Sequence, residues 1–428
     1  MVVLAITTIT TTTAHPSRKI SKPDINPDCG SEDFCTDPWL VHVSSSGQND
    51  TIHHLWGLHG SPSFLLAKTQ VAAKLDVNWS KLTADEELSV TFQPEPSHVF
   101  GLVFPYLILY NDTNDKGQLN RSEDATLNLN MSDFSWTIVD TEYANRTNGG
   151  WASVTFNTTA FRGTPLPNDT NLSIKMFGYG NDGRSWKIPK LMYTPTSGQM
   201  ELLLHRLVLN ITEEDLEMTS DDSISMNGYV NPRWALQMVV VSSEPVVHGQ
   251  EEDEKDIQLH QSTSLDDENS PGVFHLDEMT TKQSRDHKGS GGYLQWRPVS
   301  YLSDEKDIND ATEPKLDTLA PLPKPVTLPL RASLAYAVLG EKMFQGDLSL
   351  ASTTVSFGQP GDGFYTESNF TSWTVAVGEG QAPVEGFSTM IIVVISLGVG
   401  IPLIIFIVGG AFIGYRKCRR EPSLLGDD

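Results

Sequence analysis

Short runs in which apolar and polar residues alternate recur along most of the chain, separated by Gly, Pro, Asn and Asp. Successive side chains on a β-strand point to opposite faces of the sheet, so this period of two, rich in β-branched and aromatic residues, predicts strands. The runs that we expect to form strands are 89–92, 99–110, 135–139, 152–156, 172–177, 200–211, 235–241, 293–299, 332–339, 348–357 and 372–377. The sequence lacks a sustained helical period in this region, which predicts a mainly β fold.

The spacing of these runs also predicts the domain organisation. About 390 residues outside the apolar C-terminal segment can bury two cores, so we expect a sandwich-like ectodomain of two β domains, at 37–248 and 291–386. Residues 1–36 precede them as a leader. Between them, 249–290 carries the charge runs EEDEKD and DDE, which is typical of an acidic linker or long loop, although its SPGVFHLDEM segment is apolar enough to pack on a sheet.

One uncharged segment, Met390–Gly414, is long enough to cross a membrane. Its 25 residues would give a helix of roughly 37 Å, against a hydrocarbon core of about 30 Å. Four cations follow it directly in the tail 415–428, namely Arg416, Lys417, Arg419 and Arg420. Basic residues next to a span mark the side that stays cytoplasmic, so the tail is expected to be cytosolic and the ectodomain lumenal or extracellular.

Asn-X-Ser/Thr sequons support this topology. Chance predicts roughly four among 20 asparagines, and the chain has eleven, all before the span. The predicted N-glycosylation sites are Asn49, Asn78, Asn111, Asn120, Asn130, Asn145, Asn157, Asn168, Asn171, Asn210 and Asn369. Such an excess is typical of a heavily glycosylated protein of the secretory pathway.

The first residues, MVVLAITTITTTTAHPS, fit this topology less well. Their apolar run is short and no basic residue precedes it, unlike a complete signal peptide. We interpret this region as a truncated or mis-started signal. The alternative is a tail-anchored protein with its bulk in the cytosol, which the sequon excess and the position of the cations both disfavour.

Charge and cysteine content narrow the classes of partner. The chain has 30 basic and 54 acidic residues, a formal net charge of -24, which argues against nucleic acid or anionic lipid as a partner. Cys29 and Cys35 are close enough in sequence for one lumenal disulfide. Cys418 lies beside the membrane, where it is either palmitoylated or an unmodified cysteine without a special role.

A search for catalytic and cofactor motifs finds no nucleophile elbow, zinc-protease helix, phosphate loop or dinucleotide fingerprint. His53 and His54 adjoin on an expected strand and would point to opposite faces, so a shared metal is not expected. We therefore expect no enzyme activity, cofactor or metal. A pair of Asp or Glu residues brought together by the fold is the alternative that the sequence leaves open.

The tail and the span carry two further candidate sites. Glu421, Leu424 and Leu425 are similar to an acidic dileucine sorting signal, which binds a clathrin adaptor, although Arg420 occupies the position where the acid is expected. In the span, four small residues share one helical stripe and could pack against a partner helix, with a transporter or a second copy as the neighbour. They are Ser396, Gly400, Ala411 and Gly414.

Several segments resemble the glycosylated lysosomal membrane protein family, namely VNWS (77–80), DFSW (133–136), SLDDENSPGVFHLDE (264–278), LQWRPVSY (294–301) and SWTVAVGEG (372–380). The resemblance implies a non-catalytic type I protein of the lysosomal membrane, an accessory subunit that protects a lysosomal major-facilitator transporter of dipeptides. The chain departs from the family in its tail, which lacks a tyrosine-based signal, and in having fewer lumenal cysteines. The alternatives are a cell-surface adhesion or receptor ectodomain and a membrane-anchored lysosomal hydrolase.

Overall fold

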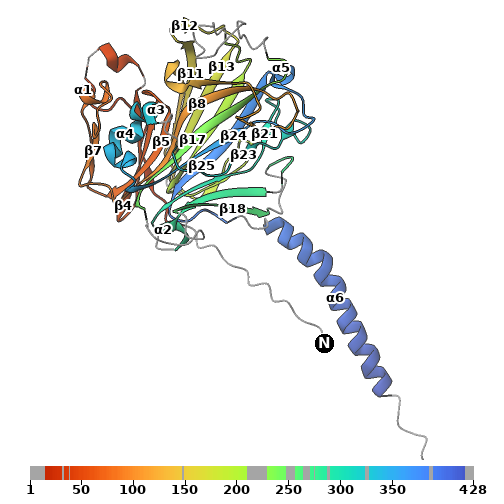
Figure 1. The fold of residues 1–428 in the computed structure, drawn as a ribbon. Coiled ribbons are helices and arrows are strands. Elements are labelled where there is room, and N and C mark those ends of the chain that lie inside the picture. Colours follow the sequence, from red (N-terminus) through yellow and green to blue (C-terminus); the bar gives the residue numbers. More distant parts are fainter. Residues whose placement is uncertain are drawn as a thin grey trace, which may run out of the picture. The chain divides into compact units, whose positions relative to one another are not determined.

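A computed structural model of the protein describes residues 15–30, 33–37, 39–146, 149–209, 229–246, 256–263, 270–273, 275–286, 290–322, 327–384 and 389–419. They fall into two compact units, a β-rich ectodomain that ends at Pro383 and a C-terminal unit that begins at Val384. The second unit contains one long helix, α6 (Thr389–Cys418) (Figure 1).

The first large sheet contains the N-terminal strands together with two long strands from later in the chain. Its main path runs in the order β1 (Lys19–Ile20), β3 (Leu40–Ser46), β4 (Asp50–Gly57), β5 (Ser63–Gln70), β8 (His98–Asn111), β17 (Pro232–Pro245), β24 (Leu348–Ser356) and β23 (Lys315–Leu316). Two short strands pair outside this path, β2 (Asp24–Ile25) with β3 and β9 (Thr126–Asn130) with β8.

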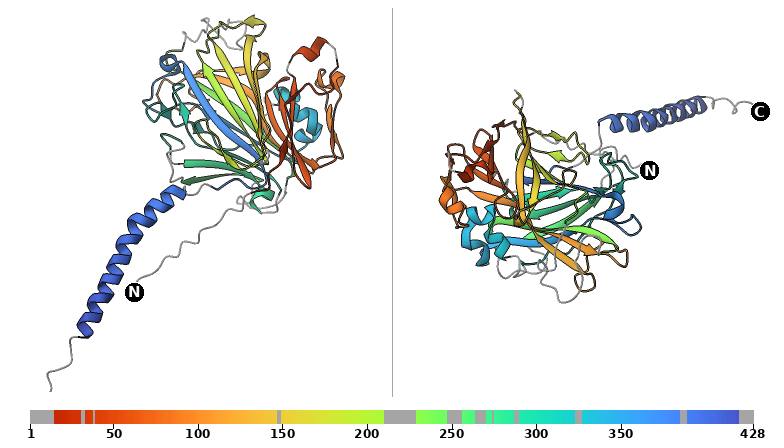
Figure 2. Two further views of the ribbon diagram at one scale, coloured as in Figure 1. Left: turned by 180° about the vertical axis from the view of Figure 1, so that it is seen from behind. Right: turned by 90° about the horizontal axis from the view of Figure 1, so that it is seen from above.

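The second large sheet packs against the first and draws its strands from the middle and the end of the ectodomain. Its path is β10 (Phe134–Ala144), β11 (Trp151–Phe161), β13 (Asn171–Tyr179), β16 (Ser197–His205), β25 (Phe370–Glu379), β20 (Gly292–Trp296), β19 (His275–Thr281) and β18 (Ile257–Thr263). Side pairings add β12 (Thr164–Pro165), β21 (Ser300–Tyr301) and β22 (Ala311–Thr312). Figure 2 shows the ectodomain from behind and from above.

Smaller elements complete the fold. Two hairpins are formed by β6 (Lys74–Val77) with β7 (Val90–Gln93) and by β14 (Gly183–Arg184) with β15 (Met192–Tyr193). The short helices are α1 (Trp79–Leu82), α2 (Lys282–Arg285), α3 (Thr327–Arg331), α4 (Leu334–Leu339) and α5 (Tyr365–Ser368), with 3₁₀ turns η1 (Asp33–Thr36), η2 (Met131–Asp133) and η7 (Gly340–Phe344).

Alternation along the strands explains why the first sheet buries both of its faces. On β5, Phe64 and Leu66 face the core between the two sheets, whereas Leu65 and Ala67 face a second core on the outer side. The second core lies beneath α1, α3, α4 and the β6–β7 hairpin, which Figure 1 shows as a layer beside β4 and β5. Two-sided burial explains the long apolar run of β8 and the apolar middle of β17.

The predicted mainly β, sandwich-like fold with one C-terminal apolar helix is confirmed. The two regions expected as separate β domains contribute neighbouring strands to the same sheets, since β17 pairs with β24 and β16 pairs with β25. The segment 249–290, expected as a linker or long loop, contributes β18, β19 and α2 to the second sheet and its edge.

One expected strand, 332–339, is wrong. The chain forms α4 there, because the side chain of Ser333 caps the helix by accepting a hydrogen bond from the Tyr336 N–H at 3.3 Å. Leu and Ala are good helix formers, and both Leu334 and Leu339 are buried in the outer core. Gly340, with φ 64°, ends the helix.

Candidate functional site

The predicted glycosylation sites are distributed over the ectodomain surface. Asn210 lies outside the described residues. The exposed asparagines are Asn49, Asn78, Asn145 and Asn168, and the partly buried ones are Asn111, Asn120, Asn130, Asn157, Asn171 and Asn369. Glycosylation of these sites stays a prediction.

Several sequons gather at one end of the sandwich. Asn171 pairs with His205 across β13 and β16, and His205 in turn pairs with Phe370, so Asn171 and Asn369 lie at the same end of the second sheet. The N–H of Leu207 donates to the hydroxyl of Tyr365 at 2.9 Å, which ties the chain beyond β16 to α5 at this end. We call this the sequon-rich end and define it by Asn168, Asn171 and Asn369.

Cys29 and Cys35 form a disulfide in the segment that leads into β3. The buried side chain of Asn26 organises the same segment. Its Nδ2 donates to the carbonyl oxygens of Cys35 at 2.8 Å and Asp37 at 2.6 Å, and its Oδ1 accepts from the N–H of Leu40 at 3.1 Å. The disulfide therefore lies in an ordered turn against the first sheet.

A pocket of about 530 Å³ lies on the outer face of the second sheet. Its cations are paired with carboxylates: Lys175 Nζ is 2.8 Å from Glu142 Oε2, Lys187 Nζ is 3.6 Å from Glu201 Oε2, and Lys306 pairs with Glu201. The hydrogen bond from Lys175 lowers the pKa of Glu142. None of the residues lining the pocket is a His or Cys, so it offers ion-paired charges rather than a nucleophile with a base.

A second pocket, of about 360 Å³, contains His42 and His53 with nearby Ser and Asp residues. Nε2 of His42 lies 2.9 Å from Nδ1 of His53, and Nε2 of His53 lies 3.0 Å from Oγ1 of Thr69. Both ring nitrogens of His53 are thus engaged in this chain. Burial lowers the pKa of His42 to about 4 and that of His53 to about 3, so both rings stay neutral down to lysosomal pH.

His53 and His54 lie on opposite faces of the first sheet, as expected. The ring of His54 is fully buried between the sheets, and a Cβ added to Gly178 or Gly198 would lie 3.3 Å from it. Both of its ring nitrogens lack a hydrogen-bond partner among the described residues. Burial lowers its pKa to about 3. The two rings therefore cannot share a metal.

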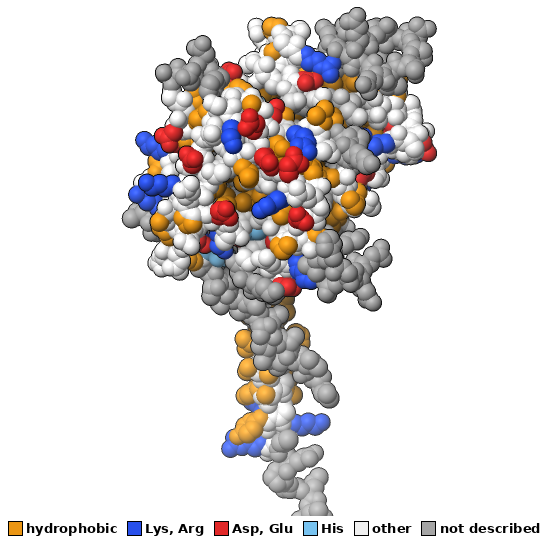
Figure 3. Space-filling view, turned by 60° about the vertical axis from the view of Figure 1, so that its left-hand side comes forward, with side chains coloured by type: hydrophobic (Ala, Val, Ile, Leu, Met, Phe, Trp, Pro, Cys, Tyr) orange, Lys and Arg blue, Asp and Glu red, His pale blue; other side chains and the backbone are white. Residues whose placement is uncertain are grey.

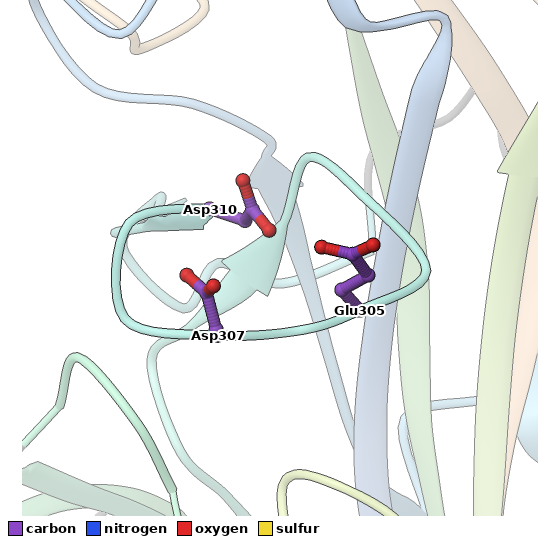
Figure 4. A group of neighbouring side chains, drawn as sticks. All are labelled: Glu305, Asp307 and Asp310. Atoms are coloured by element: carbon purple, nitrogen blue, oxygen red, sulfur yellow. The ribbon is translucent and has the colours of Figure 1, made fainter.

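Among the described residues, three exposed or partly exposed carboxylates form a cluster with the spacing that a metal site would need. Oxygens of Glu305, Asp307 and Asp310 lie within 4.8 Å of one another in the loop between β21 and β22 (Figure 4). Asp310 accepts a hydrogen bond from Ser303, and Asp307 accepts from the N–H of Asn309 at 2.6 Å. These bonds account for the loop's shape, and we assign no ligand to the cluster. In the sequence, the close spacing of the acidic residues at 305, 307 and 310 is the pattern that points to this cluster.

Two neighbouring carboxyl groups on β19 have raised pKa values. Burial raises the pKa of Asp277 to about 6 and also raises that of Glu278. Adjacent residues on a strand point to opposite faces, and the two side chains accept from different partners, Gln261 at 3.1 Å and Gln295 at 3.4 Å. They do not form the facing pair that glycosidase chemistry requires.

The surface charges are mixed in sign. On the face drawn in Figure 3, acidic and basic side chains are interspersed over the ectodomain, and no large basic patch is visible there. This agrees with the expectation that nucleic acid is not a partner, which stays a prediction.

Helix α6 extends the expected span at both ends and has Pro402 in its interior. Leu397–Lys417 is long and apolar enough to cross a membrane. Gly400, Ala411 and Gly414 lie on this helix, and an added Cβ at either glycine would meet no atom within 4 Å. The side chains of Ser396 and Cys418, and the sorting residues Glu421, Leu424 and Leu425, lie outside what the structure describes.

Sequence comparisons decide the family. The model of the glycosylated lysosomal membrane protein family matches residues 39–420, from β3 to beyond the end of α6. The chain belongs to this family. It is similar to glycosylated lysosomal membrane protein B of Xenopus laevis, with 27% identity over 95% of this chain and 92% of the relative. It is also similar to the proteins of that family name from Mus musculus, at 24% identity over 89% and 85%, and Homo sapiens, at 24% over 87% and 82%.

Family membership and α6 together confirm the expected location. The protein is a single-pass protein of the lysosomal membrane, and its large β ectodomain precedes the span. The family match includes the LQWRPVSY segment, whose Leu294–Trp296 portion is buried in β20 beside β25. That segment therefore carries structure in the centre of the second sheet.

Proposed function

We propose that this protein is a non-catalytic accessory subunit that protects a lysosomal major-facilitator transporter of dipeptides from lumenal proteases. Membership of the glycosylated lysosomal membrane protein family, whose resemblance implied this role, supports the proposal. The observation that carries it is the number and distribution of sequons on a folded, membrane-anchored ectodomain.

Glycans on these sequons would make the ectodomain an effective shield. Proteases cleave exposed loops and termini, where the chain can adapt to their active sites. Asn168 lies in the loop between β12 and β13, and Asn369 lies between α5 and β25, so sugars at these positions would cover loops at the sequon-rich end. A shield of this kind requires stability and coverage but no reactive site.

The described side chains favour a protective role over hydrolysis. The lysines of the outer pocket are ion-paired, and the rings of His42 and His53 are hydrogen-bonded to each other. The two carboxyl groups of β19 whose pKa values are raised point to opposite faces of the sheet. Catalysis by a serine or cysteine would need a nucleophile hydrogen-bonded to a base, and neither pocket described above has this arrangement.

The direct test is the lifetime of the transporter. We expect the transporter that this protein binds to be degraded several-fold faster in cells that lack the protein. The wild-type chain, or an inhibitor of lysosomal proteases, should restore the level of the transporter. Co-purification of the two full-length proteins supplies the binding measurement. A stable transporter in the absence of this chain would overturn the protective role. Peptide or glycoside hydrolysis by the purified protein would support the hydrolase alternative.

Sequon variants test whether sugars provide the protection. The triple change Asn168→Gln, Asn171→Gln and Asn369→Gln removes the three sequons of the sequon-rich end. The matched control changes Asn49, Asn78 and Asn145 to Gln. We expect the first variant to shorten the lifetime of the transporter more than the control while binding is retained. Equal lifetimes in wild type and both variants would show that glycans are not the protective element.

The span provides a separate test of how the subunits bind. In lipid, small residues let helices approach closely, so Gly400→Leu with Gly414→Leu should reduce co-purification with the transporter if α6 makes the contact. Gly398→Leu with Gly409→Leu is the matched control, because these glycines lie on another side of α6. Undiminished recovery with both pairs would assign the contact to the ectodomain.

A further inference from the structure

A buried group of charged side chains joins the two sheets at the end where β25 finishes. His98, the first residue of β8, lies with Glu244 of β17 and Glu379 of β25, and all three side chains are almost fully buried. Lys68 of β5 pairs with His98 in the strand register and lies 3.6 Å from Glu379. We call His98, Glu244, Glu379 and Lys68 the inter-sheet charge cluster.

Each nitrogen of the His98 ring lies near a carboxylate oxygen. Nδ1 is 2.6 Å from Oε2 of Glu379, whereas Nε2 is 3.1 Å from Oγ of Ser242 and 3.5 Å from Oε1 of Glu244. A neutral imidazole carries one N–H, so with the proton on Nδ1 the other nitrogen can accept from the hydroxyl of Ser242 but presents a lone pair to Glu244. The doubly protonated ring donates in both directions and attracts both carboxylates.

The carboxylates need this positive charge. Oε1 of Glu244 and Oε1 of Glu379 are buried and have no hydrogen-bond partner among the described residues. A buried carboxylate oxygen without a donor is costly unless a cation lies nearby. Lys68 provides one positive charge for the two carboxylates, so the four-residue cluster carries a net charge of -1 when His98 is neutral and of zero when it is protonated.

Further charged groups surround the cluster on two sides. On one side, Lys68 also lies 3.9 Å from Asp50 of β4, and Asp50 pairs with Arg18 at 2.5 Å. On the other side, the N–H of Gln283 in α2 donates to Glu244 Oε2 at 3.2 Å, and Arg285 of the same helix interacts electrostatically with Glu244. His98 is the imidazole of this cluster, beside two carboxylates and a lysine.

We propose that His98 is a proton-controlled clasp, which, when protonated, locks β8 and β17 of the first sheet to β25 of the second and so stabilises the ectodomain in acid. Histidine gains its proton between neutral and lysosomal pH, which is the change that a protein meets on its way to the lysosome. The clasp would be weaker during synthesis and stronger at the destination. This inference rests on the lysosomal location and not on the proposed transporter, so the isolated protein suffices to test it.

The experiment measures the melting temperature of the full-length glycosylated protein in detergent micelles at about pH 5 and about pH 7.5. His98→Gln keeps a side chain that can donate and accept but cannot become a cation. We expect its melting temperature to fall below that of the wild type at least about twice as far at the acidic pH as at the neutral one. A loss of equal size at both pH values, or a larger loss at neutral pH, would overturn the clasp.

Two further variants keep the test decisive. His15→Gln is the matched control, because Nδ1 of His15 lies 2.9 Å from Oδ1 of Asp182 in an exposed pair, and its effect should be small at both pH values. Glu244→Gln removes one of the two carboxylates, so it should be tolerated better at neutral pH than in acid. Equal destabilisation by Glu244→Gln at both pH values would also count against the proposal.

Hydrogen exchange of the wild-type protein covers the case in which His98→Gln does not fold. After correction for the intrinsic effect of pH on exchange, amides near His98 and Glu379 should be more protected in acid. The edge strand β18 provides the internal control. Protection near the cluster that is unchanged or lower in acid would overturn the clasp without any variant.

Discussion

His53 and His54 are neighbours in sequence but lie in two different cores. His53 bonds to His42 and Thr69 beneath the outer layer, whereas His54 lies between the sheets, with Gly178 and Gly198 close to its ring. The alternation of a β-strand places the two rings on opposite faces. The imidazole of His53 therefore has hydrogen-bond partners, whereas that of His54 has ring contacts with Trp56 and Phe64 and no hydrogen-bond partner among the described residues.

His54→Phe should improve stability in acid. The pKa of His54 is lowered to about 3 in the folded protein, while the unfolded chain has the ordinary value near 6.5, so its contribution is present above pH 6.5 and is lost as pH falls. At about pH 5 the penalty is about 2 kcal/mol, and phenylalanine removes it. Melting temperatures should show a larger gain, or smaller loss, at pH 5 than at about pH 7.5.

His53→Phe is the control for this change. It removes the bonds to His42 and Thr69, so it should destabilise the protein at neutral pH. A pH-independent effect of His54→Phe would contradict the assignment of His54 as a neutral buried ring.

Asp277→Asn should stabilise the ectodomain at neutral pH. Burial raises the pKa of Asp277 to about 6 from an ordinary value near 3.8, so the favourable contribution of the protonated form is lost as pH rises through 6. Asparagine avoids a buried charge and can still accept from Gln261. We expect a gain of about 2 kcal/mol at about pH 7.5 and almost none below about pH 4, measured by chemical denaturation. A gain of the same size at both pH values would refute the cause given.

Arg233→Met should be strongly destabilising. The buried guanidinium donates to Asp112 at 2.9 Å, Asp115 at 2.8 Å and Asp362 at 2.7 Å, so its removal leaves Asp112 and Asp362 as buried, uncompensated charges. Loss of one partner from such a group costs about 3–5 kcal/mol. The matched control is Arg206→Met, which breaks an exposed pair with Asp169 and should cost less than about 1 kcal/mol in the same denaturation experiment. Similar costs for the two variants would contradict this interpretation.

The double change Leu424→Ala and Leu425→Ala should move the protein toward the plasma membrane. The two leucines would supply the apolar anchors that a clathrin adaptor binds, and they follow the acidic Glu421. Surface biotinylation measures the redistribution, and Ser423→Ala is the control within the same segment. Unchanged lysosomal residence of the double variant would reject direct sorting by these leucines and point to transport with a partner.

The mainly β fold could be predicted because period-two alternation is a local property. The residues 172–177 and 372–377 fall within β13 and β25 as expected. Helix α4 was missed because LAYAVL is apolar throughout and short, so packing of Leu334 and Leu339 on the outer core decides its structure. The grouping of β17 with β24 and of β16 with β25 was equally inaccessible, since strand pairing over such distances depends on the whole fold.

The candidate sites show the same division. Sequons and the apolar span are contiguous in sequence, so they could be located by inspection. His98 and Glu379 are 281 residues apart, and neither belongs to a local motif. Their contact exists because β8 and β25 lie in different sheets that meet at one end. The loop carboxylates Glu305, Asp307 and Asp310 were overlooked because exposed acids are common in such loops.

Strand β25 is the last strand of the ectodomain to be synthesised, yet it lies inside the second sheet, between β16 and β20. Until residues 370–379 have entered the lumen, β16 and β20 each lack the strand that pairs with one of their edges. The backbone groups of these edges remain open to wrong pairing. The sheet can therefore close only when nearly the whole ectodomain has been translocated. Quality control in the secretory pathway would consequently act on the completed chain, and a truncation before β25 would remove a central strand rather than shorten an edge.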